Sequence, residues 1–184
     1  MASFASSTRE FNCKYKMNNT EMKHYKSSEW GFALDIPRRW NSFPPVPTNN
    51  PYEVIRFASR EDGIHAIIIF REPYDPKQTL KQHSDQIKRI LTSKGFGNFV
   101  TAETKIKSRA ALILDFDRAH EEANLPIILV GERYVLRPER RWSCRHYFIA
   151  RGTLAYTLGF GTTNKAGMFK LFDRIAKSFE AQTE

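Results

Sequence analysis

The chain has 184 residues and a formal net charge of +9, from 29 Lys and Arg against 20 Asp and Glu. Hydrophobic residues make up 41% and charged residues 27%, which is the balance of one globular domain with a core of ordinary size. Its longest apolar runs, at 66–70 and 126–130, are far shorter than the ~20 apolar residues of a membrane span. The positive net charge favours an acidic partner, such as a protein surface, a nucleic acid or an anionic membrane.

The N-terminus lacks a basic region ahead of an apolar stretch, so no secretory signal is expected. We expect a soluble protein of the cytoplasm or of an organelle interior, and a Ser-rich remnant of a transit peptide stays an alternative. Two free thiols, Cys13 and Cys144, are the simpler interpretation than one disulfide.

The first half of the chain predicts a tail, a strand and a β-hairpin. Residues 1–22 are polar and without period, and indicate a flexible basic tail ahead of a single domain at 23–182. Alternation of apolar residues predicts a strand at 31–36, which Pro37 ends. Two β-rich runs, at 53–59 and 64–71, flank an Asp-Gly turn and predict a hairpin.

A helix is predicted next, from a Thr79 cap to about Lys94, with Gly95 as its stop. Its apolar stripe is expected to consist of four residues: Leu80, Ile87, Ile90 and Leu91.

The second half predicts two more hairpins and a closing helix. The hairpins comprise 98–107 with 110–118, turned at 108–109, and 142–151 with 153–160, turned at Gly152. The helix at 166–179 places Phe172 and Phe179 on one face, a spacing that suits packing on a sheet. Residues 119–141 form a long excursion of undecided structure.

Strands outnumber helices in this pattern, and most neighbouring strands are joined by short turns. The fold class is therefore α+β, with a largely antiparallel sheet packed by two main helices.

This order of elements resembles the PsbP-like superfamily, which includes the extrinsic PsbP protein of photosystem II, Mog-type Ran-binding factors and DcrB-like proteins. The features that carry the resemblance are the opening Phe32-x-Leu-x-Ile-Pro-x-x-Trp40, the strand 64–70, the helix 79–94, the strands 110–116 and 147–160, and the closing Ile-Ala-Lys-Ser-Phe at 175–179.

The resemblance covers roughly residues 24–180 and implies an α/β/α sandwich that binds protein partners instead of catalysing reactions. The chain departs from the family in its long 119–141 excursion. It departs also in its basic charge, which differs from the acidic surface expected of Mog-type members.

Catalytic and metal signatures are weak. Cys144 and His146 share a strand face with apolar residues, so a buried thiol and a hydrogen-bonded histidine are favoured over a metal site. Asp115 and Asp117 share a face as well, and charge pairing with arginines of a later strand, Arg145 and Arg151, is favoured over acid–base work. No enzyme activity, cofactor or metal is expected.

One cluster points to a partner. Five arginines within 13 residues are interleaved with Tyr134 and Trp142: Arg133, Arg137, Arg140, Arg141 and Arg145. Arginine forks bind carboxylates or phosphates, and aromatic faces stack on bases or guanidinium planes. Arg38 and Arg39 join this predicted partner-binding set if the fold brings them close.

The leading hypothesis is a non-catalytic binding or assembly factor, or a peripheral subunit, that docks on an acidic protein partner or a larger complex. A nucleic-acid or ribonucleoprotein-binding protein is the alternative, supported by the charge and by the arginines. A chaperone of hydrophobic segments is the third hypothesis, and it requires an exposed apolar groove.

Overall fold

The computed structural model describes residues 20–46, 50–59, 66–118, 142–162 and 165–182. These residues form two antiparallel sheets and two helices. A seven-stranded sheet has the order β3-β4-β5-β9-β8-β7-β6, and a three-stranded sheet has the order β1-β2-β10. The strands are β1 (Met22–Ser27), β2 (Phe32–Pro37), β3 (Trp40–Phe43), β4 (Glu53–Ser59), β5 (Ala66–Pro73), β6 (Phe96–Ile106), β7 (Arg109–Arg118), β8 (Trp142–Arg151), β9 (Leu154–Thr162) and β10 (Glu180–Ala181).

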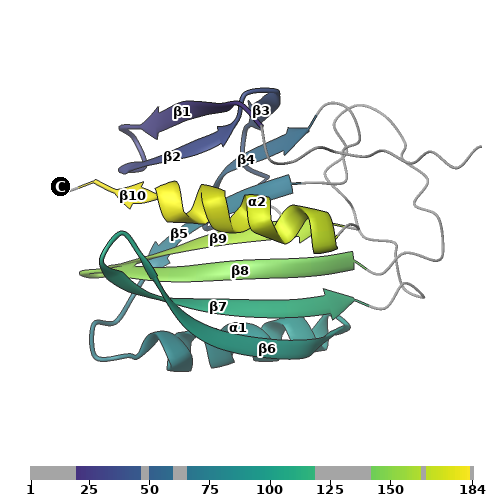
Figure 1. Cartoon of the computed structure of the whole chain (residues 1–184). Helices are drawn as coiled ribbons and strands as arrows, with labels where there is room; N and C mark the ends of the chain where they lie inside the picture. Colours follow the sequence, from purple (N-terminus) through teal and green to yellow (C-terminus); the bar gives the residue numbers. More distant parts are fainter. Residues whose placement is uncertain (1–19, 47–49, 60–65, 119–141, 163–164, 183–184) are drawn as a thin grey trace, which may run out of the picture.

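The two helices cover opposite faces of the large sheet (Figure 1). Helix α1 (Leu80–Ser93) packs on β6, β7 and β8, and helix α2 (Lys165–Ser178) packs on β8 and β9 and on β2 of the small sheet. This arrangement confirms the predicted α+β sandwich with a largely antiparallel sheet.

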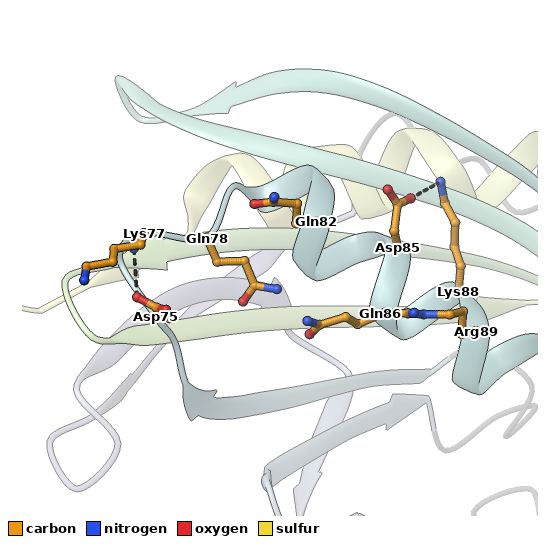
Figure 2. A pocket seen from close by; sticks show the side chains of 8 residues that line it. All are labelled: Asp75, Lys77, Gln78, Gln82, Asp85, Gln86, Lys88 and Arg89. Atoms are coloured by element: carbon orange, nitrogen blue, oxygen red, sulfur yellow. Dashed lines mark hydrogen bonds and ion pairs between the residues drawn. The ribbon is translucent and has the colours of Figure 1, made fainter.

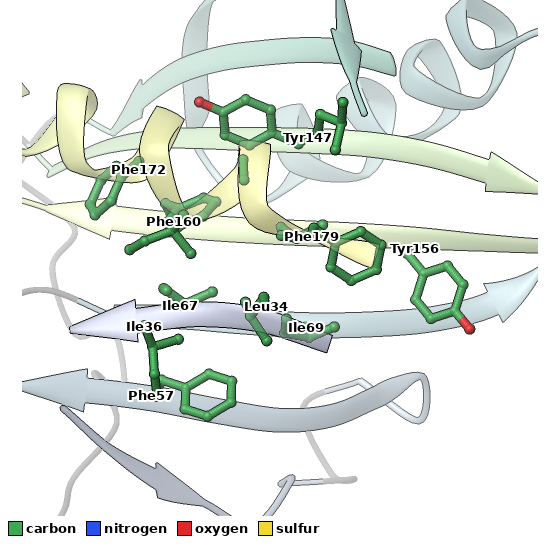
Figure 3. Close-up of a cluster of buried hydrophobic side chains, with 14 of the residues drawn as sticks. Leu34, Ile36, Phe57, Ile67, Ile69, Tyr147, Tyr156, Phe160, Phe172 and Phe179 are labelled. Carbon is green, nitrogen blue, oxygen red and sulfur yellow. The ribbon is translucent and has the colours of Figure 1, made fainter. Parts of the chain in front are cut away.

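The larger part of the core lies between the sheet and α2 (Figure 3). Phe172 of α2 contacts Phe160 of β9 with ring centroids 4.6 Å apart, and Phe179 stacks on Phe32 of β2 at 5.8 Å. All four rings are 2% exposed or less. The apolar face predicted for the closing helix is thus confirmed, and it ties α2 to both sheets.

Helix α1 covers a second, smaller cluster on the other face. Its N-terminus carries a capping box, in which the Thr79 hydroxyl accepts from the Gln82 backbone N–H and the Gln82 side chain accepts from the Thr79 N–H. Leu80, Ile87 and Leu91 pack on the sheet as predicted. The prediction for the fourth residue of the stripe, Ile90, is wrong, because this residue is 52% exposed.

Several strand bounds differ from the sequence prediction. β9 continues through Gly161 to Thr162 instead of ending at Phe160, and Gly161 leaves room for the Trp142 ring of β8. β6 begins at Phe96, two residues early, with a bulge at Asn98, whose φ is 55°. The hairpin that follows turns at 107–108, one residue before the predicted position.

Three short strands, β1, β3 and β10, were not predicted. β1 begins at Met22, the last residue of the predicted tail. The division into a tail at 1–22 and a domain at 23–182 stays a prediction, because residues 1–19 lie outside the described part of the chain.

Candidate partner-binding site

Half of the predicted partner-binding residues lie outside the described part of the chain. These are Arg133, Arg137, Arg140 and Arg141, within 119–141. The structure does describe Arg38, Arg39, Trp142 and Arg145.

Arg38 and Arg39 form the two-residue turn between β2 and β3, and both are exposed. The Arg38 Nη1 lies 3.2 Å from the Glu21 carboxylate, and the two side chains are 72% and 75% exposed. An ion pair this exposed contributes ~0–1 kcal/mol, so it holds Arg38 weakly. The turn therefore presents two guanidinium groups to solvent.

The register of the sheet places this turn at the same end as the start of β8. Trp40, which follows the turn, pairs with Ser59, and the ladder continues through β5 and β9 to the β8 residues beside Trp142. Trp142 itself pairs with Arg118, so the two residues that flank 119–141 lie side by side at this end. β3 and β8 are four strand spacings apart, or about 19 Å. The structure thus puts these segments at one end of the sheet, but not in contact.

Trp142 is partly buried on the α1 face, where it packs against the second core cluster. A Cβ on Gly161 would lie 2.4 Å from its ring, so the indole occupies the space that this glycine leaves open. Much of the ring therefore serves the packing of β8 on β9.

Arg145 is held within its own chain. Its Nε and Nη2 donate to the two carboxylate oxygens of Asp115, both at 2.7 Å, and its Nη1 donates to Asp173 of α2 at 2.7 Å. The guanidinium also lies over the Phe169 ring, 4.3 Å from its centroid. These interactions raise the pKa of Arg145 above its ordinary value, and the hydrogen bonds to Asp115 have the largest effect. The side chain is 16% exposed, so its donors face inward.

The predicted pairing of Asp115 with Arg145 is confirmed. Arg151, the other predicted partner of these aspartates, instead donates to the Ala181 carbonyl of β10.

Cys144 and His146 lie beneath α1. Burial raises the pKa of the Cys144 thiol, and the buried thiol that the sequence favoured is confirmed. Burial lowers the pKa of His146 to about 4, so its imidazole is neutral at neutral pH. The ring lies 4.8 Å from that of Phe116, but its Nδ1 is buried without a hydrogen-bond partner, contrary to the hydrogen-bonded histidine that was expected. Among the described residues no cluster of His, Cys, Asp and Glu could hold a metal ion.

A hollow of about 840 Å³ lies along α1 and the turn before it (Figure 2). Its charges are nearly balanced, and Lys88 pairs with Asp85 at 3.0 Å. It is a polar helix face, lined by Asp75, Lys77, Gln78, Gln82, Asp85, Gln86, Lys88 and Arg89.

A second cavity, of about 580 Å³, lies at the opposite end of the sheet from Trp142. Its lining includes four cationic side chains from β1, the β6–β7 turn, β7 and β8, which are Lys26, Lys107, Arg109 and Arg151. We call this cavity the cationic groove. Sequence reasoning missed it because these residues come from three segments of the chain that are up to 125 positions apart.

The described helices include none that is long and apolar enough to cross a membrane.

Comparison with known proteins gave no matching family model and no curated protein similar in sequence. Solved structures do match over nearly the whole chain. Cyanobacterial PsbP (CyanoP) from Synechocystis sp. PCC 6803 matches with a TM-score of 0.61 at 14% identity, over 90% of this chain and 95% of that one. The Ran-binding protein Mog1p of Saccharomyces cerevisiae matches with a TM-score of 0.60 at 10% identity, over 89% and 96%.

The chain adopts the PsbP-like fold. LpqN of Mycobacterium tuberculosis, a protein involved in cell envelope biogenesis, is similar as well, with a TM-score of 0.56 at 8% identity over 89% of this chain and 91% of that one. The fold predicted from the order of elements is thereby confirmed. Identities this low establish the PsbP-like architecture and not a shared partner.

Proposed function

We infer that this PsbP-like protein is a non-catalytic binding or assembly factor that docks on an acidic protein partner or a larger complex. The observation that carries this proposal is the placement of basic residues at one end of the sheet. The exposed Arg38–Arg39 turn lies at the same end as Arg118 and Trp142, which flank the arginine-rich residues 119–141.

We define the basic end as the turn Arg38–Arg39 together with four arginines of the excursion, Arg133, Arg137, Arg140 and Arg141. Arg145 and Trp142, which the sequence placed in this set, are left out of the proposed contact surface, because Arg145 is held by Asp115 and Asp173 and Trp142 is packed on Gly161. An acidic surface would supply carboxylates to the arginine forks, which bind them in bidentate fashion.

The same structure bears on two alternative functions, a chaperone of hydrophobic segments and a nucleic-acid-binding protein. Among the described residues the large exposed apolar side chains are Tyr52, Ile90 and Val100, which lie in the turn before β4, on α1 and on β6. Their scatter gives no support to a chaperone of hydrophobic segments. Nucleic-acid binding would use the same arginines, and the experiment below separates it from protein binding.

The test is a pull-down with the tagged full chain from native lysate at physiological salt, with and without nuclease, read by mass spectrometry. We expect a defined set of proteins that survives nuclease. Arg137→Ala/Arg140→Ala/Arg141→Ala should release this set, and Arg38→Ala/Arg39→Ala should weaken its retention.

The matched control is Lys77→Ala/Lys81→Ala/Lys177→Ala, which removes the same charge from exposed positions in the turn before α1, on α1 and on α2. It should retain the set, because the proposal depends on the place of the charges and not on their number. A set of nucleic-acid-binding proteins that disappears with nuclease would instead establish the nucleic-acid alternative.

A further inference from the structure

The cationic groove concentrates positive charge that the described part of the chain does not neutralise. Four cationic side chains line it against a single acidic one, Glu180 of β10. Lys107 pairs with Glu180, and Arg151 donates to the Ala181 carbonyl. Lys26 and Arg109 are exposed, and neither side chain has an ion pair or a hydrogen bond within the described residues. Two of the four cations are therefore left for a ligand.

The register of the strands forces like charges together here. β7 and β8 pair Ala111 with Ile149, and the same register brings Arg109 to the position opposite Arg151 two residues further. Like charges directly opposite each other on neighbouring strands are destabilising, because their Cβ atoms lie about 5 Å apart. An anion between the two guanidinium groups would remove this repulsion.

The side chains of the other two cations, Lys26 and Lys107, line the same groove. Ala33 of β2 pairs with both Lys26 and Glu180, so these two side chains leave the same face of the small sheet on either side of it. Lys107 reaches Glu180 from the β6–β7 turn, which lies beside β10 at the left of Figure 1. Lys107 and Ser108 both have positive φ, 49° and 58°, a conformation that costs energy for residues other than glycine.

Beneath the cations the groove has an apolar floor. Ile106, Ile149 and Phe179 line it, and each is 2% exposed or less. A volume of about 580 Å³ is within the range of small-molecule sites, which combine apolar walls with a few placed polar groups. The arrangement suits an organic anion with its charged group on the rim.

We propose that the cationic groove binds the phosphate monoester group of an organic ligand. Phosphate is favoured over a single carboxylate because it carries close to two negative charges and three acceptor oxygens. These match the free Lys26 and Arg109, the remaining N–H groups of Arg151 and, once Glu180 is displaced, Lys107. Glu180 occupies part of this site in the free protein and competes with the ligand for Lys107.

The groove lies at the opposite end of β8 from the basic end and does not depend on the proposed function. The phosphate monoester can belong to a soluble metabolite or to a lipid headgroup, and the two sources share the same contacts.

Calorimetric titration of the full chain with phenyl phosphate tests the soluble source. We expect saturable binding that is tighter than that of inorganic phosphate, because of the apolar floor, and tighter than that of benzoate, because of the charge. Arg109→Gln should weaken it by about tenfold or more. Glu180→Gln should strengthen it, because it frees Lys107. Flotation with phosphatidylcholine vesicles, with and without phosphatidic acid, tests the headgroup source.

Arg89→Gln on α1 is the matched control, since it removes an exposed arginine outside the groove. It should leave the affinity within about twofold. Arg109 and Lys26 are exposed, so Arg109→Gln and Lys26→Gln are expected to fold, and thermal unfolding checks this. The absence of Arg109-dependent binding to both phenyl phosphate and phosphatidic acid vesicles would overturn the proposal, as would equal weakening by Arg89→Gln.

Discussion

His146 shows how the burial of one titratable residue couples stability to pH. Its pKa in the folded chain is about 4, against an ordinary 6.5. Between these values the unfolded chain binds a proton that the folded chain excludes, so stability is complete above pH 6.5 and falls as the pH drops toward 4. A difference of this size corresponds to at most about 3 kcal/mol.

We therefore predict that the His146→Leu variant loses less stability than the unmodified protein as the pH falls from 6.5 to 4. The measurement is the free energy of unfolding in urea from pH 7 to pH 4 for both proteins. The carboxylates common to both chains cancel in the comparison. A difference between the two proteins that stays constant over this range would show that His146 does not titrate as argued.

Glu53 and Arg56 of β4 form a buried ion pair, with side chains 2% and 5% exposed. The Arg56 Nη2 donates to Glu53 Oε2 at 2.7 Å, and its Nε donates to the other carboxylate oxygen. Removal of one partner leaves the other charge buried without compensation, which costs about 3–5 kcal/mol.

Glu53→Gln should thus lower the free energy of unfolding by about this amount, as measured in urea at neutral pH. The double substitution Glu53→Met/Arg56→Met removes both charges together and should recover most of the loss. If the double variant were as unstable as Glu53→Gln, packing at this site rather than charge would account for the effect.

At the scale of elements, the bounds of a helix or strand were predicted best where the residues that determine them lie within or next to that element. The α1 cap and its stop were found because the Thr79 capping box and Gly95 adjoin the helix. β4 and β8 were found with their bounds because both carry dense apolar runs.

The elements that were missed owe their conformation to contacts distant in sequence. β10 has two residues and exists because it pairs with β2, about 150 positions earlier. Ile90 was misplaced because apolarity alone does not tell which edge of a helix faces a sheet. The residues of α1 that are buried include His83 and Ser84, which the apolar pattern did not mark.

The cap of α1 provides a prediction at this scale. Thr79→Ala removes the acceptor for the Gln82 N–H and should cost about 1 kcal/mol in the free energy of unfolding. Thr92→Ala is the control, because its exposed hydroxyl bonds the Lys88 carbonyl inside the helix, where alanine is the better helix former. Urea unfolding compares the two. A cost as large for Thr92→Ala would mean that the capping hydrogen bond has no special role.

At the scale of the whole molecule, the candidate sites could be predicted only in part. The arginine cluster of the excursion is local in sequence and was visible as such. The cationic groove is assembled by strands of both sheets, and a single sequence does not show that Lys26 and Arg151 line one cavity. The Arg38–Arg39 turn thus lies at one end of the large sheet, and the cationic groove lies at the other.

These two sets should act independently. Trp142 and Arg151 mark the two ends of β8, nine residues or about 30 Å apart. This separation is several times the Debye length of about 8 Å at physiological salt, so charge at one end is largely screened from the other. We predict that Arg38→Ala/Arg39→Ala binds phenyl phosphate within about twofold of the unmodified protein. Arg109→Gln should likewise retain the partners captured in the pull-down. Loss of both activities on substitution at either end would mean that the two ends form one continuous surface for a single polyanion, which is the behaviour expected of nucleic acid.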